Sequence, residues 1–410
     1  MRIRRSERGQ ALILIVLSIF GLFGVVALVV DGGNAFVQTR RAQSAADAAA
    51  LGGALSRIRG EDWVDAAYAI AAQQGFENDT ATAGVAVNSP PLSGPYEGNI
   101  EYIQVVIGAR VRTYLASVVG IPYIQTSVQA VARTKSSEIA EILDGSAVIS
   151  LASRSDCSSQ RAFWVHGEAT LSVTGADIFI NSNNEDCALI EQGSGSILVQ
   201  DGEIVVVGGA SIQKPQLITP YPPRTGSVPI AYPPPFFMPS IGCKQDAVIS
   251  PDGTTMSSGS WYEDFPPPGV TTLEPGEYCL EGDFHIGDTR TLQGHDVVFE
   301  VSRGKVRWSG TATINLDAPS AGPLDGLLVY MPPENHNVVV LNADRDSEIM
   351  GTILAPGSEV RLNGAESESG FHSQIIAYRV EVDGQQIIWV RYLDEQNWDA
   401  ITMPEIHLAQ

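Results

Sequence analysis

Four cysteines are the side chains whose chemistry is easiest to interpret in this sequence: Cys157, Cys187, Cys243 and Cys279. None of them forms the Cys-x-x-Cys pair that is typical of a structural zinc site. An even number of cysteines in an exported segment indicates disulfide bonds, and four cysteines allow three pairings. We favour the sequential pairing, Cys157 with Cys187 and Cys243 with Cys279, because it closes the shortest loops; buried free thiols are the alternative.

The histidines show no spacing that would hold a metal ion. They form no HxxxH or HxH pair and fall in separate predicted strands or turns: His166, His285, His295, His336, His372 and His407. The sequence also lacks a GxSxG motif, a phosphate-binding glycine loop and a GxGxxG motif after a strand. We therefore predict no catalytic residue, no bound metal and no cofactor.

Carboxylates offer the one route to catalysis that the sequence leaves open. Polysaccharide-cleaving β-helical enzymes gather acidic and basic side chains in one groove. Such a group could form here on neighbouring strands from Asp344, Asp346, Glu348 and Arg361. Aspartates are equally typical of solvated turns, where they bond the local backbone. We favour the turn interpretation, and a membrane-tethered polysaccharide lyase or hydrolase is the alternative function.

An uncharged segment near the N-terminus determines where the rest of the chain lies relative to a membrane. Residues 11–30 contain no charged side chain, and Ala11 and Val30 mark the ends of this run. As a helix, such a run spans about 30 Å, the thickness of the hydrocarbon core of a bilayer. It is longer than the apolar region of a cleaved signal peptide, although a small-x-small cleavage site follows at residues 33–35. We predict a transmembrane helix.

The distribution of charge predicts which end of this helix is cytoplasmic. The apolar run is preceded by Arg2, Arg4, Arg5 and Arg8. The positive-inside rule then places residues 1–10 in the cytoplasm and the rest of the chain outside. The net charge of −22 would repel a phosphate backbone, so nucleic acid is not an expected partner. We expect a single-pass protein of the cytoplasmic membrane that contacts lipid through its helix.

Two regions are expected beyond the membrane. Residues 31–135 combine Ala-rich helical segments with alternating strand patterns, which predicts a small α+β module. In residues 140–410 short apolar strands recur between Gly, Asn and Asp turns, a pattern that suits a parallel β-helix. A Pro-rich insertion at residues 214–240 is expected to form an extended loop across its face. The predicted fold class is therefore mainly β, with a transmembrane helix, a pilin-like α+β module and a right-handed parallel β-helix-like solenoid.

The first third of the chain resembles a known family. The likeness is carried by residues 8–11 (RGQA), by the apolar run that ends in Val30 and Asp31, and by residues 40–51 (RRAQSAADAAAL). Residues 114–120 (YLASVVG) add to it. These segments resemble the N-terminal module of TadG-like proteins of the Flp pilus, or tight adherence, assembly systems of bacteria. The resemblance implies an envelope location and contacts with pilus assembly components.

Two departures from related proteins narrow the expected role. Prepilins of these systems are cleaved after a glycine that is followed by a conserved glutamate, and the residues after Gly9 lack that glutamate. The unprocessed TadG type is therefore expected. Many TadG-like proteins carry a von Willebrand A domain with an Asp-x-Ser-x-Ser metal motif. The nearest stretch here, from Asp144 to Val148, lacks the last serine, so we predict no such site.

Three functions follow as hypotheses. We favour a structural or adhesive envelope protein that works with pilus assembly components and contacts a pilus, a neighbouring cell or a surface polymer. The glycan-cleaving enzyme is the second hypothesis, and a minor pilin-like component of the fibre is the third. The small side chains of residues 42–50 would permit close packing, either on another membrane helix or on the protein's own ectodomain.

Overall fold

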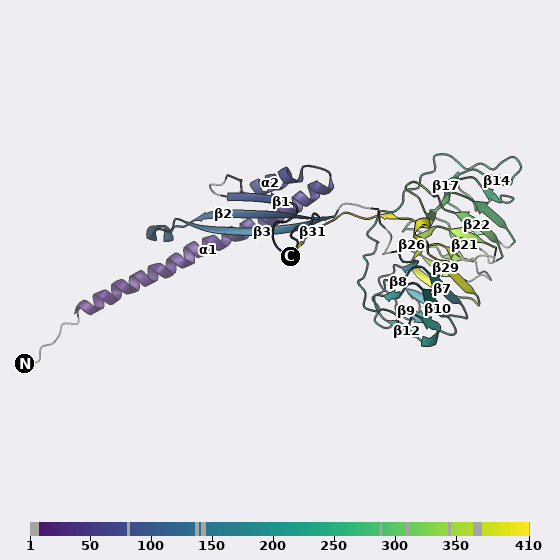
Figure 1. Cartoon of the computed structure of the whole chain (residues 1–410), viewed down its shortest axis with the longest axis horizontal. Helices are drawn as coiled ribbons and strands as arrows, with labels where there is room; N and C mark the ends of the chain where they lie inside the picture. The colour runs from purple at the N-terminus through teal and green to yellow at the C-terminus, as the bar shows by residue number, and fades with distance from the viewer. Residues whose placement is uncertain are drawn as a thin grey trace, which may run out of the picture. The chain divides into compact units, whose positions relative to one another are not determined.

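The computed structural model describes residues 8–79, 83–135, 139–140, 145–287, 289–308, 311–342, 346–363 and 371–409 (Figure 1). The chain divides into two compact units. Unit 1 comprises Met1–Ser137 together with Met403–Gln410, and unit 2 comprises Glu138–Thr402. This division corrects the C-terminal end of the region expected at residues 140–410, because the last strand of the chain belongs to unit 1.

Unit 1 begins with one long helix, α1 (Arg8–Ile58). Helical structure continues without a break through residues 31–33, although two of these residues are glycines. The N-terminal part of α1 is apolar and exposed, whereas its C-terminal part buries one face. That face consists of alanines three and four residues apart, so they lie on one side of the helix. They have no exposed surface: Ala42, Ala45, Ala46, Ala49, Ala50 and Ala54.

An antiparallel sheet packs against the alanine face of α1 and against α2 (Trp63–Gln73). Its order is β1-β2-β3-β31. Alternation along β2 buries Ile103, Val105 and Ile107 toward the helices. The last strand pairs with β3, with Leu408 opposite Ala132. The strand bounds are β1 (Ala83–Asn88), β2 (Tyr102–Arg112), β3 (Tyr123–Lys135) and β31 (Glu405–Ala409).

Unit 2 consists mostly of short parallel strands in two large sheets. The 10-stranded sheet contains β7 (Thr170–Thr174), β10 (Ser196–Gln200), β13 (Ile218–Thr219), β14 (Thr255–Met256), β16 (Thr272–Leu273), β19 (Thr291–Gly294), β22 (Thr313–Asp317), β25 (Glu348–Met350), β27 (Phe371–His372) and β29 (Ile387–Arg391).

The 15-stranded sheet forms the other side of the same core. It contains β5 (Val148–Ser150), β6 (Phe163–Val165), β8 (Ile178–Ile180), β9 (Leu189–Glu191), β11 (Ile204–Val206), β12 (Ala210–Ile212), β15 (Gly259–Trp261), β17 (Gly276–Leu280), β18 (Phe284–Ile286), β20 (Val297–Val301), β21 (Val306–Trp308), β23 (Leu327–Tyr330), β24 (Val339–Leu341), β26 (Thr352–Leu362) and β28 (Ile375–Val382). A small antiparallel pair joins β4 (Ile139–Ala140) to β30 (Ala400–Ile401).

The order of strands in unit 2 does not follow the chain. The main path of the 15-stranded sheet runs β11-β8-β5-β28-β26-β23-β20-β17-β15. The first strand, β5, lies beside the late strand β28, with Ile149 opposite Ile376. The chain therefore enters and leaves the sheet near its middle. It first builds outward to β11, then crosses to the far end at β15, and builds back toward β28.

The Pro-rich segment makes that crossing. After η2 (Pro215–Leu217) and β13, the chain reaches β14, which is at the opposite end of the 10-stranded sheet. Along the way Phe236 is buried in an apolar cluster with Ile149 and Ile376, and its ring centroid lies 6.1 Å from that of Trp398. The segment predicted as a surface loop is thus also the connection between the two ends of the unit.

Candidate functional site

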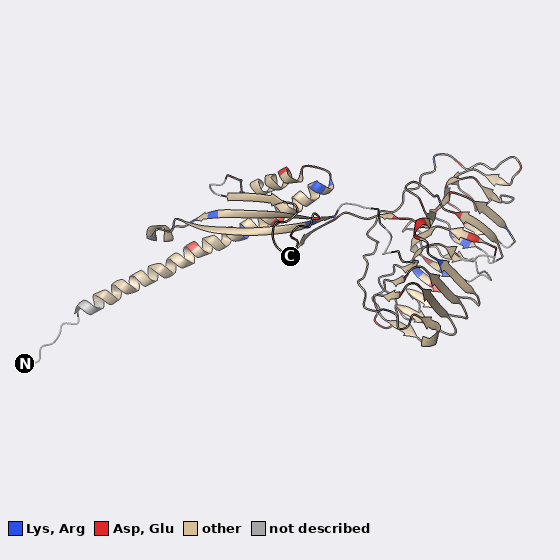
Figure 2. Cartoon of the chain, viewed as in Figure 1, with Lys and Arg blue, Asp and Glu red and all other residues tan. Residues whose placement is uncertain are grey.

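The apolar half of α1 is the feature with the plainest functional consequence. Phe20 and Leu28 are 72% and 76% exposed. Figure 2 shows no charged residue along this part of the helix. Within the described residues, α1 is long and apolar enough to cross a membrane. Of the two residues that mark the predicted span, Val30 is exposed, and the side chain of Ala11 lies outside the described part of the chain.

The arginines that predict the orientation of the helix fall at the margin of the described chain. Arg2, Arg4 and Arg5 lie outside the described residues, and only the helical backbone of Arg8 is described. The cytoplasmic placement of residues 1–10 therefore stays a prediction from charge.

Asp31, where the uncharged run ends, binds the loop between β2 and β3. Its carboxylate accepts backbone hydrogen bonds from Tyr114 (2.7 Å), Leu115 (3.0 Å) and Ala116 (2.7 Å). The bond from Tyr114, with those from Ala116 and Leu115, lowers the pKa of Asp31. These donors stand at the start of η1 (Ala116–Val119), where N–H groups lack partners within the helix. The carboxylate of α1 thus caps a turn that belongs to another element.

The cysteines form two disulfide bonds in unit 2. Cys157 is bonded to Cys187, and Cys243 is bonded to Cys279. This is the sequential pairing, and the structure contains no free cysteine among its described residues. Both bonds lie in the unit that the sequence places outside the cytoplasm, where disulfides persist.

The side chains proposed for a catalytic groove occupy different places. Asp344 lies outside the described residues. Glu348 is in β25 of the 10-stranded sheet, whereas Arg361 is in β26 of the 15-stranded sheet. Arg361 instead contacts Glu359 at 2.7 Å and Glu381 at 3.0 Å. The hydrogen bond that Arg361 donates to the carboxylate of Glu359 raises the pKa of Arg361. The structure thus corrects the proposed grouping of Arg361 with Glu348.

A different set of polar side chains gathers around Trp164. The guanidinium carbon of Arg161 lies 3.6 Å from the centroid of the Trp164 ring, and the ring of His166 stacks on it at 3.5 Å. His166 contacts Glu381 at 2.9 Å. Part of this set lines a cavity of about 160 Å³. We call the set the Trp164 cluster: Arg161, Trp164, His166, Glu359, Arg361, Arg379 and Glu381.

The Trp164 cluster lies where the two halves of the 15-stranded sheet meet. Strand β28 pairs there with β6 on one side and with β26 on the other. The Nε atoms of Arg161 and Arg379 are buried without a hydrogen-bond partner among the described residues. Arginine donors beside an indole ring suit the recognition of a carboxylate-bearing or sugar-bearing chain. Glycoside hydrolysis would need two carboxyl groups with distinct roles, but Glu359 and Glu381 are both paired with Arg361.

The histidines take separate roles in the structure. His336 Nδ1 lies 3.0 Å from the carbonyl oxygen of Gly357, and His295 contacts Asp317. Burial lowers the pKa of His372. In the part of the chain that the structure describes, no group of three or more His, Cys, Asp or Glu side chains is placed to hold a metal ion.

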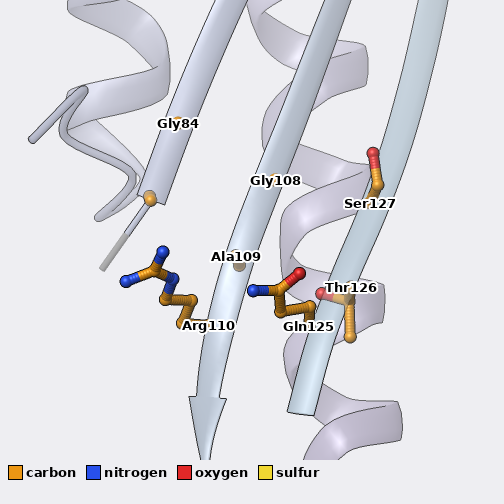
Figure 3. A pocket seen from close by; sticks show the side chains of 8 residues that line it. Gly84, Gly108, Ala109, Arg110, Gln125, Thr126 and Ser127 are labelled. Atoms are coloured by element: carbon orange, nitrogen blue, oxygen red, sulfur yellow. The ribbon is translucent and has the colours of Figure 1, made fainter. Parts of the chain in front are cut away.

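A shallow hollow of about 330 Å³ lies on the sheet of unit 1 (Figure 3). It forms because Gly84 and Gly108 face each other across β1 and β2 without side chains. Figure 3 shows the side chains of Arg110 and Gln125 beside it. Its lining contains no carboxylate, histidine or cysteine, so the hollow offers a polar surface without acid–base or nucleophilic groups.

Comparison with known proteins finds a family match for the N-terminal segment. Residues 9–56 match the family model described as Tad, putative Flp pilus-assembly TadE/G-like. No curated protein matches the chain. A solved structure, the competence-associated pilin ComZ from Thermus thermophilus, aligns at 13% identity over 80% of this chain and 88% of that chain. Its TM-score of 0.24 does not define a shared fold. The class indicated is a protein with a Tad pilus-assembly module at its N-terminus.

Proposed function

We propose that this protein is a membrane-anchored, extracytoplasmic structural and adhesion protein that is associated with Flp (tight adherence) pilus assembly. The observation that carries the proposal is α1. Its exposed apolar half runs without interruption into the alanine face that builds unit 1, and both halves fall within the residues that match the Tad model. Leaving that apolar surface in water would cost about 25 cal/mol per Å², so lipid is its natural environment.

In this proposal residues 1–10 lie in the cytoplasm, residues 11–30 cross the membrane, and the rest of unit 1 and all of unit 2 lie outside. The four arginines before the helix support that orientation. The two disulfides of unit 2 support it independently, since thiols are kept reduced in the cytosol. Most of the negative charge follows the helix and suits a soluble exported body.

We further propose that unit 2 is a right-handed parallel β-helix-like solenoid. Its support is the regular parallel pairing, with Thr170 opposite Ser196 and Ile178 opposite Ile204. Stacked parallel strands leave long lateral surfaces that suit contacts with extended partners. A pilus, a neighbouring cell or a surface polymer would fit such a surface.

The proposed role requires no catalysis. A glycan-cleaving activity is the second candidate. The arginine donors and the indole ring of the Trp164 cluster suit a bound glycan, although Glu359 and Glu381 are both paired with Arg361. Full-length protein in detergent is to be incubated with acidic and neutral polysaccharides, with the Arg361→Ala variant as control. We expect glycan binding or no interaction, and no new reducing or unsaturated ends. Cleavage that the Arg361→Ala variant loses would overturn the non-catalytic proposal.

The anchoring proposal is tested in cells by separating display from secretion. One strain lacks the gene, and a second carries the chain with residues 1–30 replaced by a cleavable signal peptide. We expect the deletion to reduce surface pili or adhesion and the released form not to restore them. Unchanged pili and adhesion in the deletion strain would contradict the proposal. Mass spectrometry of the N-terminus of the membrane-bound protein separates this role from that of a processed pilin-like subunit.

A further inference from the structure

The loop between β2 and β3, residues 113–122, presents an apolar tip. Tyr114 and Val118 are 65% and 83% exposed, and the side chains of Ile121 and Tyr123 are also exposed. No charged residue occurs between Arg112 and Arg133. Apolar and aromatic side chains gathered in this way on an otherwise acidic protein mark a surface that meets another phase or partner.

The position of this loop follows from its bonds to α1. Asp31 is the first charged residue after the uncharged run of the helix and accepts the N–H groups of Tyr114, Leu115 and Ala116. The side-chain amide of Asn34 donates to the carbonyl oxygen of Arg112 at 3.3 Å. In Figure 1 the loop is at the ends of β2 and β3, beside α1. It is therefore held at the level where α1 would leave the bilayer.

The backbone of the loop is suited to a layer that is poor in water. Polar backbone groups that lack partners are costly there. Thr113 donates to Pro122, Val118 to Leu115, and Ile121 to Ala116. Gly120 donates to Ser117, and Pro122 has no N–H group to satisfy. With the three donors held by Asp31, most of the loop's backbone N–H groups have acceptors within unit 1.

We infer that the β2–β3 loop lies in the interfacial layer of the membrane that α1 spans, and that lipid covers its exposed side chains. Tyr114 and Tyr123 would lie at headgroup level, where aromatic residues with a polar end are favoured. Val118 and Ile121 would reach the upper acyl chains. The exposed Arg110 and Arg112 on β2 would face anionic headgroups. The inference rests on the proposed span, and it gives unit 1 a second point of attachment beside the helix.

The test measures the depth of single nitroxide labels on the full-length protein. Single cysteines are introduced as V118C in the loop, L22C in the apolar helix and E97C in the exposed turn between β1 and β2. The native cysteines are disulfide-bonded, so the new thiols can be labelled without reductant. Glu97 is the matched control, because it precedes the start of β2, whereas the β2–β3 loop follows the end of β2. The two ends of this strand are about 35 Å apart.

Each variant is placed at one chain per nanodisc of phosphatidylcholine and phosphatidylglycerol. We expect the labels at Val118 and Leu22 to collide more often with oxygen than with a water-soluble nickel chelate, and the label at Glu97 to show the reverse. A water-like label at Val118 with a lipid-like label at Leu22 would overturn this inference and leave the span intact. Water-like labels at both positions would overturn the span as well. Protection of Val118 only in native membranes, or only with two chains per nanodisc, would assign the surface to a protein partner.

Discussion

The carboxylate of Asp31 accepts a 2.7 Å hydrogen bond from the backbone N–H of Tyr114, a residue 83 positions later in the chain. This contact fixes a loop of the sheet to the helix at the end of its uncharged run. We expect Asp31→Asn to weaken it, because an amide has one acceptor oxygen and no charge. Amide hydrogen exchange of residues 114–116 should accelerate while α2 stays protected.

The matched control is Asp62→Asn, which alters the N-terminal cap of α2, where Asp62 accepts from Val64 and Asp65. Its effect should stay at α2, since asparagine is also a good cap.

The stabilisation of the loop by Asp31 should depend on pH with a defined sign. The lowered pKa of Asp31 means that its contribution is present above the ordinary value of 3.8 and is lost as the pH falls through the folded-state value. Equal amide exchange of residues 114–116 in wild type and Asp31→Asn at neutral pH would show that the hydrogen bonds to Asp31 do not hold the loop in place.

The disulfides predict a second result, for the stability of unit 2. The bonds close loops with sequence separations of 30 and 36 residues. Removing either pair by double Cys→Ser substitution should cost about 2–4 kcal/mol, because the unfolded chain regains conformational freedom. Calorimetry should show the transition of unit 2 lowered by about 5–15 °C. Reductant should lower the transition temperature of unit 2 in the wild type, and it should not change that of a variant that lacks both disulfides. Free thiols that react with a thiol reagent in the native wild-type protein would refute the pairing.

The strands of unit 2 were predictable where their signal is local. Short apolar stretches such as those around Ile178 and Ile204 stand between turn residues, and both became strands. Their order was not predictable, because Ile149 pairs with Ile376 and no local pattern links residues so far apart. For the same reason the sequence assigns β31 to the region at residues 140–410, although Ile406 and Leu408 pack on the core of unit 1.

The residues of the candidate sites were likewise predictable only in part, because their contacts form between distant parts of the chain. Asp31 and residues 114–120 were both singled out by their resemblance to the TadG-like module, but their hydrogen bonds are a tertiary contact. The Trp164 cluster was missed because its members come from β6, β26 and β28 and from the residues on either side of β6. Of its members, the sequence singles out Arg361, which it groups with carboxylates such as Glu348 of the other sheet, and His166, which it names only among separate histidines.

Close stacking of glycines predicts a third result. A Cβ atom added to Gly304 would overlap the backbone carbonyl of Gly282, whereas one added to Gly287 would meet open space. We expect Gly304→Ala to lower the free energy of unfolding of unit 2 by about 1–3 kcal/mol, since backbone must shift to admit the methyl group. Gly287→Ala should change it by less than about 0.5 kcal/mol. Denaturant unfolding of both variants measures the difference, and equal midpoints would argue against the close packing.

Glu300 predicts a stabilising substitution. Desolvation, together with the charge of Glu277, raises the pKa of Glu300 above its ordinary value of 4.5. At neutral pH the folded state therefore carries a penalty for the ionised form, and Glu300→Gln should raise the melting temperature of unit 2. The sign follows from linkage: the penalty is present above the folded-state pKa and disappears once the carboxyl is protonated in both states, below 4.5. A gain that persists unchanged at lower pH would assign the effect to packing.

Because β28 pairs with strands of both halves of the sheet, a destabilising substitution in β28 should affect both halves. Val380 is buried, opposite Phe163 of β6 and Val360 of β26. Val380→Asp places an unpaired charge in that position and should cost about 3–5 kcal/mol. Because β28 joins strands that precede the Pro-rich crossing to strands that follow it, hydrogen exchange should accelerate in β5 and β6 as well as in β26. Val380→Ala, which removes volume without adding charge, is the milder control. Loss of protection confined to β28 would mean that the two halves of unit 2 are stable without each other.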